Sequence, residues 1–481
     1  MATGTISLAT KKNSAVKKTI LVCTLAVSLL FVSCFEDNDD NTQPASTVAI
    51  QDFIWRGLNF FYLYKADTPE LANDAFATQG DYDSFLASFD SPEAFFEFLR
   101  SSRDRFSFLV DDYNDLEDAL SGVTLNNGME FGLVLYPDGS GNVFGYARYV
   151  LPNTDAEAKG ITRGIIFNTI DGQQITDANF SGLIAPTTYT IGLATLANDV
   201  ITPTGESIEL TKTEYTEDPI FNNTTFDING KKIGYLMYNA FTNEFDSQLN
   251  SVFGQFNSEG VTDLVLDLRY NGGGSVRTAT YLASMITGQF TGQTMYTEQW
   301  NEDRQAEFAE NGVFVNSFVG GGEAINSLNL TTVYVLTTSR TASASELIIN
   351  SLTPYINVVQ IGDNTTGKYQ ASFLMYDSPN FQRTVDINPN HTYAMLPLVF
   401  QTANSNGFTD FDDGLVPNIA QTEDLTNLGV LGTQTEPLLA TAIAEIAGIP
   451  IPGTDSTFTH MEVISESKAG SPIYQLMIVE R

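Results

Sequence analysis

From Lys231 onward, apolar segments typical of buried strands alternate with segments of helical periodicity. This alternation indicates βαβ units, in which helices connect parallel strands, and so predicts an α/β core around a largely parallel sheet. Between Gly288 and Leu330 the chain is Gly-rich and irregular, and we expect an excursion from the core. Strands are predicted at 233–238, 264–269, 332–336 and 357–361, and helices at 276–286, 344–352 and 439–446.

Two other patterns precede this core. Residues 49–122 carry apolar side chains at three- and four-residue spacing, which predicts an N-terminal helical module. Residues 125–212 instead show short strands separated by turn residues, which predicts a β-rich domain. The core is assigned to 225–440, and 441–481 form a C-terminal tail. We therefore expect an α/β (α+β) multidomain protein, as a length of 481 residues also suggests.

The first 34 residues have the pattern of an export signal. Four lysines precede the apolar run 20–31, which is short for a membrane span. The run ends in Phe31-Val32-Ser33-Cys34, which resembles a bacterial lipobox and implies acylation of Cys34; an ordinary signal peptide is the alternative. Residues 35–48 then form an acidic tether. The expected location is the bacterial cell envelope, lipid-anchored at the outer membrane and facing either the periplasm or the outside.

Charge and rare residues exclude several classes of function. The chain has 23 Lys and Arg against 58 Asp and Glu, so it lacks the positive surface that nucleic acids require. Both cysteines lie in the first 34 residues, which leaves no disulfide framework in the body. With His391 and His460 as the only histidines, an HExxH zinc site is absent, and we expect neither metal nor cofactor.

Three segments could carry chemistry, and each has a structural alternative. Asp267–Ser275 runs from a strand into three glycines, whose amides suit an oxyanion, although a tight turn would look the same. Ser343 opens a helix and could be a nucleophile, but Ser343 and Glu346 also match a capping box. Lys368 follows a strand and could be a desolvated base or a solvated surface lysine.

Together, these segments resemble the carboxyl-terminal processing peptidases (tail-specific proteases), a family of Ser-Lys serine peptidases. The family's Asp-Leu-Arg, Asn and glycine run stands at 267–274, its Ser-Ala-Ser-Glu box at 343–346, and its Gly-Lys pair at 367–368. The 25-residue interval between Ser343 and Lys368 also fits. The resemblance implies a core of the ClpP/crotonase-like type.

The resemblance also implies roles for individual residues. Ser343 would be the nucleophile and Lys368 the general base. The N–H groups of Ala344 and Gly274, or Gly273 in its place, would form the oxyanion hole. The family's Gly-Thr-Val-Gln after the lysine is absent here, so Gln370 and Ser372 are the candidates for orienting Lys368.

Residues 125–212 resemble a PDZ domain. Phe131, Gly132 and Leu133 would belong to the loop that binds a peptide carboxylate, with the next strand pairing the peptide; a plain β-rich spacer is the alternative.

The function predicted from these features is a serine endopeptidase that cleaves proteins or peptides near their carboxyl termini, with a free carboxyl terminus as the recognised feature. The alternative is a non-catalytic PDZ-like peptide-binding surface lipoprotein. A third hypothesis, an esterase pairing Ser343 with His391, has less support because His391 lies in a polar segment and is expected at the surface.

Overall fold

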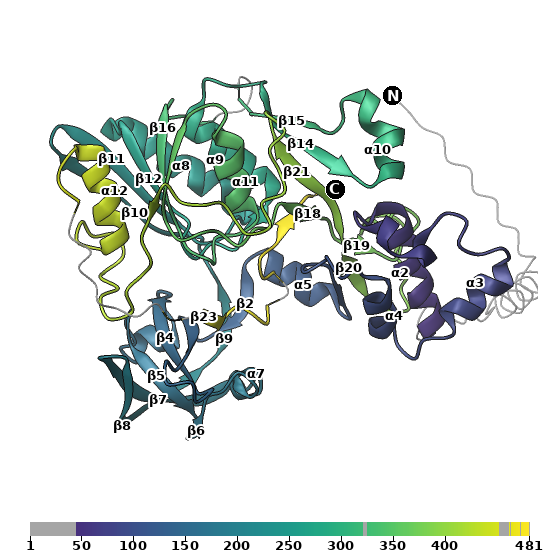
Figure 1. Ribbon diagram of the computed structural model, residues 1–481, viewed down its shortest axis with the longest axis horizontal. Helices are drawn as coiled ribbons and strands as arrows, with labels where there is room; N and C mark the ends of the chain where they lie inside the picture. Colours follow the sequence, from purple (N-terminus) through teal and green to yellow (C-terminus); the bar gives the residue numbers. More distant parts are fainter. Residues whose placement is uncertain (1–44, 321–324, 452–460, 462, 472, 481) are drawn as a thin grey trace, which may run out of the picture. The chain divides into compact units, whose positions relative to one another are not determined.

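The computed structural model describes residues 45–320, 325–451, 461, 463–471 and 473–480 (Figure 1). The predicted signal segment, Cys34 and most of the acidic tether lie outside these residues. Residues from Ser46 onward form one unit, to which all contacts below belong. Within the described ranges, no helix combines the length and apolar character needed to cross a membrane.

The central sheet of the core has six strands in the order β10–β11–β12–β16–β17–β22. β10 pairs antiparallel with β11, and every other pair is parallel, as the alternating sequence pattern predicted. These strands are β10 (Ile220–Ile228), β11 (Lys231–Tyr238), β12 (Asp263–Asp267), β16 (Thr332–Thr337), β17 (Asn357–Gly362) and β22 (Ile419–Ala420). The later positions of the long parallel strands are buried and mainly apolar because helices cover both faces of the sheet.

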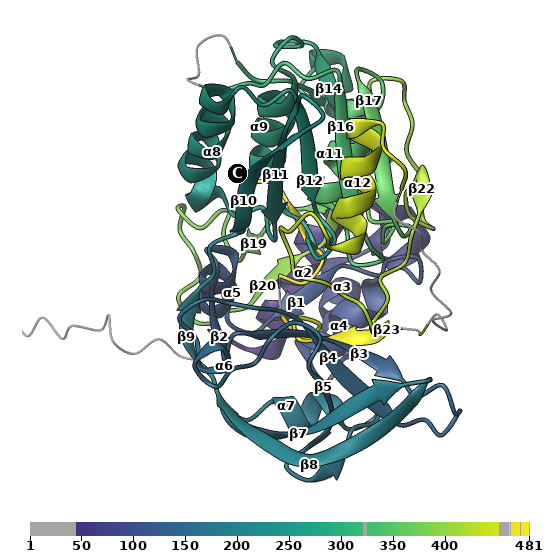
Figure 2. The ribbon, with the colours of Figure 1, turned by 90° about the vertical axis from the view of Figure 1, so that its left-hand side faces the viewer.

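Figure 2 shows α12 (Pro437–Ala447) on one face of the sheet and α8 (Asp246–Glu259), α9 (Val276–Thr287) and α11 (Ala344–Leu352) on the other. Leu439 and Ile443 of α12 pack in one buried cluster with Tyr235 of β11 and other inward-facing strand residues. The end of the core predicted at residue 440 falls inside this helix, so the core extends at least to Ala447.

A second sheet has the order β13–β24–β18–β21–β14–β15. Its strands are β13 (Gly274–Ser275), β14 (Thr294–Trp300), β15 (Val315–Ser317), β18 (Gln370–Ser372), β21 (Leu398–Asn404) and β24 (Met477–Ile478). The expectation of an irregular excursion over 288–330 was therefore wrong in part, because β14, α10 (Glu302–Phe308) and β15 lie there. β14 pairs with β21, about a hundred residues later, and no local pattern reveals such a partner.

The N-terminal module is helical, as its periodicity predicted. It contains α2 (Thr47–Phe61), α3 (Gln79–Leu86), α4 (Pro92–Leu99) and α5 (Tyr113–Leu120), and Ser46 and Ser91 cap α2 and α4. β1 (Phe108–Val110) pairs with β20 (Ala394–Leu396), which pairs with β19 (Met375–Tyr376). Short 3₁₀ helices lie at Lys65–Asp67, Pro69–Leu71, Asn243–Phe245 and Ala309–Asn311.

The β-rich domain contains a sheet in the order β23–β3–β4–β5–β7–β8, with β6 beside β5. Its first strand, β23, comes from the C-terminal end of the chain. The elements are β3 (Met129–Leu135), β4 (Val143–Val150), α6 (Asp155–Ala158), β5 (Ile166–Ile170), β6 (Gln173–Gln174), α7 (Phe180–Ile184), β7 (Thr188–Ala197), β8 (Val200–Thr211) and β23 (Val463–Glu466); beside them β2 (Val123–Asn126) pairs with β9 (Thr213–Thr216).

Phe131, Gly132 and Leu133 do not form the expected loop, because they lie inside strand β3. Gly132 is explained by packing: a Cβ there would lie 2.6 Å from Cε1 of Tyr146 on β4. One edge of β3 pairs with β4 and the other edge pairs with β23. The edge at which a peptide strand could pair is thus occupied by a segment of the same chain.

Candidate active site

The three segments with candidate chemistry follow three neighbouring parallel strands. The glycine turn comes after β12, Ser343 after β16 and Lys368 after β17, and these strands are adjacent in the sheet. The carboxyl ends of parallel strands share one edge, which is where open α/β sheets bind ligands. The fold thus brings residues about a hundred positions apart to one place.

Ser343 is fully buried and immediately precedes α11. Its backbone adopts the left-handed conformation, with φ 66°, which costs a residue with a side chain about 1 kcal/mol or more. Its N–H donates to Oε2 of Glu346 at 2.7 Å, which is the carboxylate half of the predicted capping box. Ser343 and Glu346 are placed as in the predicted capping box, but the Oγ atom makes no hydrogen bond of standard geometry among the described residues.

Glu346 connects the serine turn to the lysine loop. Its carboxylate accepts hydrogen bonds from the main-chain N–H groups of Ser343, Gly367 and Lys368 at 2.7 to 2.9 Å, and from the hydroxyl of Thr365 at 2.5 Å. Burial raises the pKa of Glu346, and these donors oppose that rise. One side chain therefore fixes the backbone on both sides of the candidate dyad.

Lys368 is completely buried, not solvated. Burial lowers the pKa of its amine from 10.5 to about 7, although the negative charges of Asp104 and Glu346 act to raise this pKa. Nζ lies 4.6 Å from the ring centroid of Phe106. It donates a hydrogen bond to the carbonyl oxygen of Gln475 at 2.6 Å. At neutral pH a large fraction of this lysine is uncharged, as a general base requires.

The glycine turn contacts Ser343 directly, because a Cβ on Gly273 would lie 2.8 Å from the serine Oγ. The N–H of Gly273 donates to Oδ1 of Asn271 at 2.8 Å and is already engaged. The N–H of Gly274 instead donates to the carbonyl oxygen of Leu476 at 2.6 Å. Both amides are therefore engaged, that of Gly273 by a side chain and that of Gly274 by a main-chain carbonyl, and the choice between them as oxyanion donors stays a prediction.

Ala344, the other candidate oxyanion donor, is the first residue of α11 and is fully buried. At this position in a helix the N–H has no partner within the helix itself. The contribution of this amide to an oxyanion hole stays a prediction.

Gln370 begins β18, and its Nε2 donates to the hydroxyl of Tyr64 at 3.2 Å. Its Oε1 is buried without a partner among the described residues, and the role of orienting Lys368 stays a prediction.

The side chain of His391 is not at the surface as expected, since it is only 5% exposed. Its Nε2 lies 3.0 Å from Asp377, and its Nδ1 accepts from the N–H of Tyr393. With both ring nitrogens engaged, the structure gives no support to an esterase that uses Ser343 and His391.

An ion network lies beneath the glycine turn. Arg269 is fully buried and pairs with Asp267 at 2.8 Å, with Glu436 at 2.6 Å and with Glu423 at 3.1 Å. Glu423 also pairs with Arg163 of the β-rich domain at 2.7 Å. The Asp-Leu-Arg sequence therefore fixes the end of β12 and links it to the segment after the core sheet.

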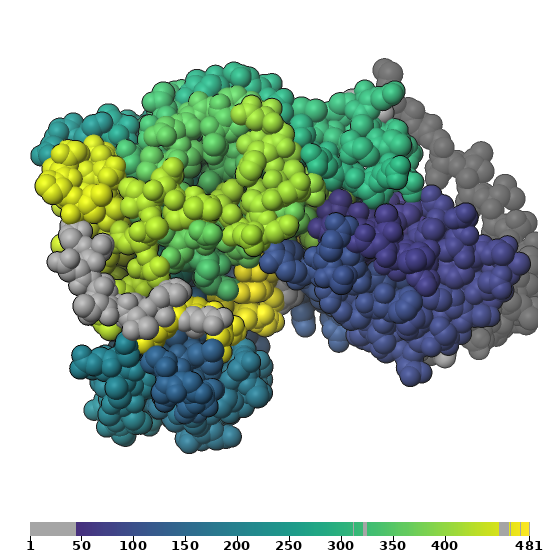
Figure 3. Space-filling view, viewed as in Figure 1, coloured from purple at the N-terminus to yellow at the C-terminus, as the bar shows by residue number. Residues whose placement is uncertain are grey.

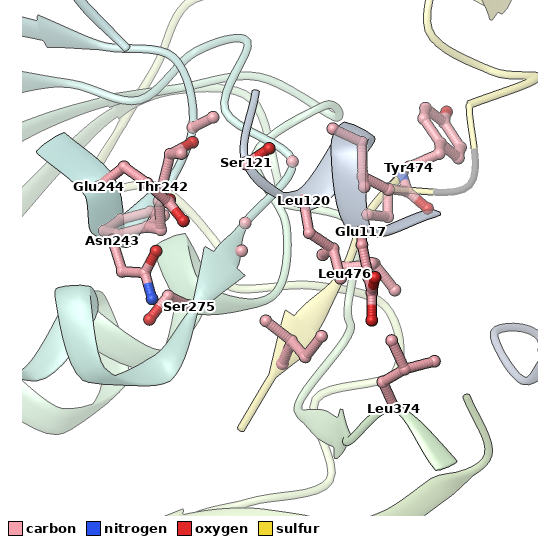
Figure 4. A pocket seen from close by; sticks show the side chains of 18 of the residues that line it. Glu117, Leu120, Ser121, Thr242, Asn243, Glu244, Ser275, Leu374, Tyr474 and Leu476 are labelled. Atoms are coloured by element: carbon pink, nitrogen blue, oxygen red, sulfur yellow. The ribbon is translucent and has the colours of Figure 1, made fainter. Parts of the chain in front are cut away.

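A cavity of about 370 Å³ adjoins the glycine turn. Figure 4 shows Glu117 and Leu120 of α5, Thr242, Ser275 and Leu476 around it. It is concave and mainly apolar with a few polar groups, the character of a site for a ligand side chain.

Two family descriptions match parts of the chain. Peptidase family S41 matches residues 232–381, which include the glycine turn, Ser343 and Lys368. The peptidase S41 N-terminal domain matches residues 49–108, which include Asp104 and Phe106 beside the lysine. The chain carries peptidase S41 domains.

Individual relatives agree with this assignment. The chain is similar to the solved structure of a protein from Bacteroides fragilis NCTC 9343 that is described as an S41 protease. The two share 26% sequence identity with a TM-score of 0.64, over 83% of this chain and 97% of the Bacteroides chain. A carboxyl-terminal-processing protease of Picosynechococcus sp. (strain ATCC 27264 / PCC 7002 / PR-6) is 28% identical over 241 residues, or 49% of this chain. That match spans about half, 54%, of the relative's length. The mixed α/β fold thus matches that of the Bacteroides S41 protease over most of both chains.

Three features of this site were not predicted from the sequence. The N-terminal module was given no chemical role, yet Asp104 and Phe106 border Lys368, and Arg105 donates to the carbonyl oxygen of Gly367 at 2.8 Å. Glu346 was read only as a helix cap. Gln475 and Leu476, which contact Lys368 and Gly274, lie in the C-terminal tail, to which no role was assigned. The run Asp104-Arg105-Phe106 carries no motif that could have signalled its position.

Proposed function

We propose that this chain is a serine endopeptidase that cleaves proteins or peptides near their carboxyl termini. Ser343 is the nucleophile, and Lys368 is the general base. The observation that carries the proposal is a completely buried lysine with a pKa lowered to about 7, whose loop shares the carboxylate of Glu346 with the Ser343 turn. The S41 domains and the carboxyl-terminal-processing relative support the same activity.

In the proposed reaction, neutral Lys368 takes the proton of Ser343 as Oγ attacks the peptide carbonyl. The N–H groups of Gly274 and Ala344 stabilise the oxyanion of the tetrahedral intermediate. Collapse of that intermediate breaks the C–N bond, and protonated Lys368 returns the proton to the leaving amine. Water then attacks the acyl-enzyme with Lys368 again as base, which releases the acid and restores Ser343.

The alternative, a peptide-binding lipoprotein without catalysis, leaves this lysine without a purpose. Burying an amine costs free energy that a structural lysine recovers through an ion pair, and Lys368 has no carboxylate within salt-bridge distance among the described residues. We further propose that the PDZ-like domain captures extended peptides along its sheet, and that Cys34 carries a lipid anchor in the bacterial cell envelope.

The test is cleavage of an unfolded polypeptide by the wild type, Ser343→Ala and Lys368→Ala, with circular dichroism to verify folding. Both variants should lose cleavage completely. Ser339→Ala is the matched control, because Ser339 lies in the same loop with an exposed side chain, and its activity should equal that of the wild type. Retained cleavage by either dyad variant would refute the mechanism, and an inactive wild type would favour the binding protein.

A further inference from the structure

The C-terminal segment, defined as residues 463–471 and 473–480, passes through the site just described. It begins as β23 on the edge of β3 in the β-rich domain and ends as β24 in the second sheet of the core. Figure 1 shows both yellow strands between these two parts, and Figure 3 shows the segment in contact with them. The glycine turn and the lysine loop lie along this path.

Two successive carbonyl groups of the segment bind the groups that the reaction would need. The oxygen of Gln475 accepts from Nζ of Lys368, and the oxygen of Leu476 accepts from the N–H of Gly274, each at 2.6 Å. Gln475 has a left-handed backbone with φ 54°, which a residue with a side chain adopts only at a cost. The backbone is thus strained where both carbonyls meet these groups.

The chain therefore holds its own backbone where a substrate backbone would lie. The Leu476 carbonyl occupies the amide that would stabilise the oxyanion. Lys368 donates to Gln475, while Oγ of Ser343 has no hydrogen bond among the described residues, so the serine–lysine hydrogen bond is not formed. A peptide could use these groups only after the segment leaves.

Side chains fasten the segment on both sides of these carbonyls. Glu466 forms ion pairs with Arg148 of β4 and with Arg340 of the loop before Ser343. Arg340 also donates to the hydroxyl of Tyr474, whose ring lies 4.8 Å from the guanidinium carbon. Leu476 is buried in an apolar cluster that includes Leu116 of α5.

We propose that the C-terminal segment is an intramolecular inhibitor that occupies the peptide-binding track of the enzyme. The inference rests on the proposed function. Extended polypeptide substrates displace the segment and then follow the same course, along the edge of β3 and between β13 and β18. Activity is then set by competition between the segment and the substrate.

The first test measures cleavage of an unfolded polypeptide by Leu476→Asp in the full chain. An aspartate in the apolar cluster would lose its hydration, which should expel the segment. If the segment is bound about 90% of the time, its release raises kcat/KM about tenfold at low substrate concentration. Leu476→Met preserves the volume and is the matched control, expected to stay at the wild-type level.

A milder variant guards against misfolding. Tyr474→Phe removes only the hydroxyl that binds Arg340 and should raise activity by a smaller factor with an unchanged circular dichroism spectrum. Hydrogen exchange gives a readout without catalysis: the Gly274 amide should exchange faster in both release variants. Lower activity in folded Tyr474→Phe and Leu476→Asp would show that the segment completes the site, which would overturn the inference.

The second test measures binding in the background of Ser343→Ala. A labelled synthetic peptide of residues 463–480 should bind Ser343→Ala, Leu476→Asp better than Ser343→Ala alone, as measured by fluorescence anisotropy, and a scrambled peptide should bind neither. Equal binding to the two proteins would refute the inference. Because no cleavage is measured, this result stands even if the proposed peptidase activity fails.

Intact-mass spectrometry separates an inhibitor from a substrate. The purified wild type should keep residues 463–480 at full length during incubation, as Ser343→Ala does. Loss of the residues after Leu476 in the wild type alone would show that the segment is cut and released, which would overturn the proposal of a resident inhibitor.

Discussion

The carboxylate of Glu346 accepts the main-chain N–H of Lys368 at 2.9 Å while the same oxygen accepts the N–H of Ser343 at 2.7 Å. The nucleophile and the base lie on loops after different strands, and this side chain sets their relative position. Since Glu346 touches main-chain groups of both, we regard it as a positioning residue.

Glu346→Gln should lower kcat/KM by about 100-fold, because an amide NH₂ facing N–H donors would shift both loops, and displacement of catalytic groups is costly. KM should change little if only the dyad moves. Glu302→Gln, in the first turn of α10 with an exposed side chain, is the control and should change neither constant. An unchanged kcat in Glu346→Gln would contradict the positioning role.

The pH dependence of cleavage should follow the Lys368 amine. Its pKa is lowered to about 7 by burial, and the neutral form is the base, so kcat/KM should rise with pH through about 7 and level off above. Rates from pH 5 to 9 on a substrate without titrating groups would measure this limb. A limb in the range of an ordinary lysine would show that the amine is solvated in the active form.

Lys368→Met should raise the free energy of unfolding at neutral pH while abolishing cleavage. Burial lowers the pKa of Lys368 in the folded state to about 7, below the ordinary lysine value of 10.5, so the unfolded chain binds more protons between these values. Wild-type stability should thus increase with pH across this window by at most about 1.4 kcal/mol per unit. Urea unfolding at pH 7 and pH 9 should show the advantage of Lys368→Met shrinking as pH rises.

Acid should weaken the network beneath the glycine turn. Burial alone would raise the pKa of Glu423, but Arg163 and Arg269 lower it from 4.5 to about 2. The stabilisation is present above the unfolded-state pKa and is lost as pH falls from about 4.5 towards 2. Glu423→Gln should cost about 3 kcal/mol at pH 7 and flatten the acid dependence. Thermal unfolding from pH 3 to 7 compares the two proteins, and parallel curves would contradict the assignment.

The core helices and strands could be predicted because their signals are local. The helix expected at 344–352 has these bounds in the structure, and the strands at 332–336 and 357–361 differ by one residue at their ends. A buried parallel strand appears as a short run of apolar residues, and an amphipathic helix as apolar residues at three- and four-residue spacing. The elements within 288–330 could not be predicted in this way, because β14 is stabilised by pairing with β21, which lies far along the chain.

The sequence by itself determined which residues could carry the chemistry: Ser343, Lys368 and the glycine turn stand in recognisable surroundings after predicted strands. Only the tertiary structure decided their environment. Phe106 buries the amine of Lys368, Glu346 connects the two loops, and the C-terminal segment places its carbonyls on Lys368 and Gly274. These contacts join parts of the chain that are distant in sequence, so they arise from packing and leave no local periodicity to read.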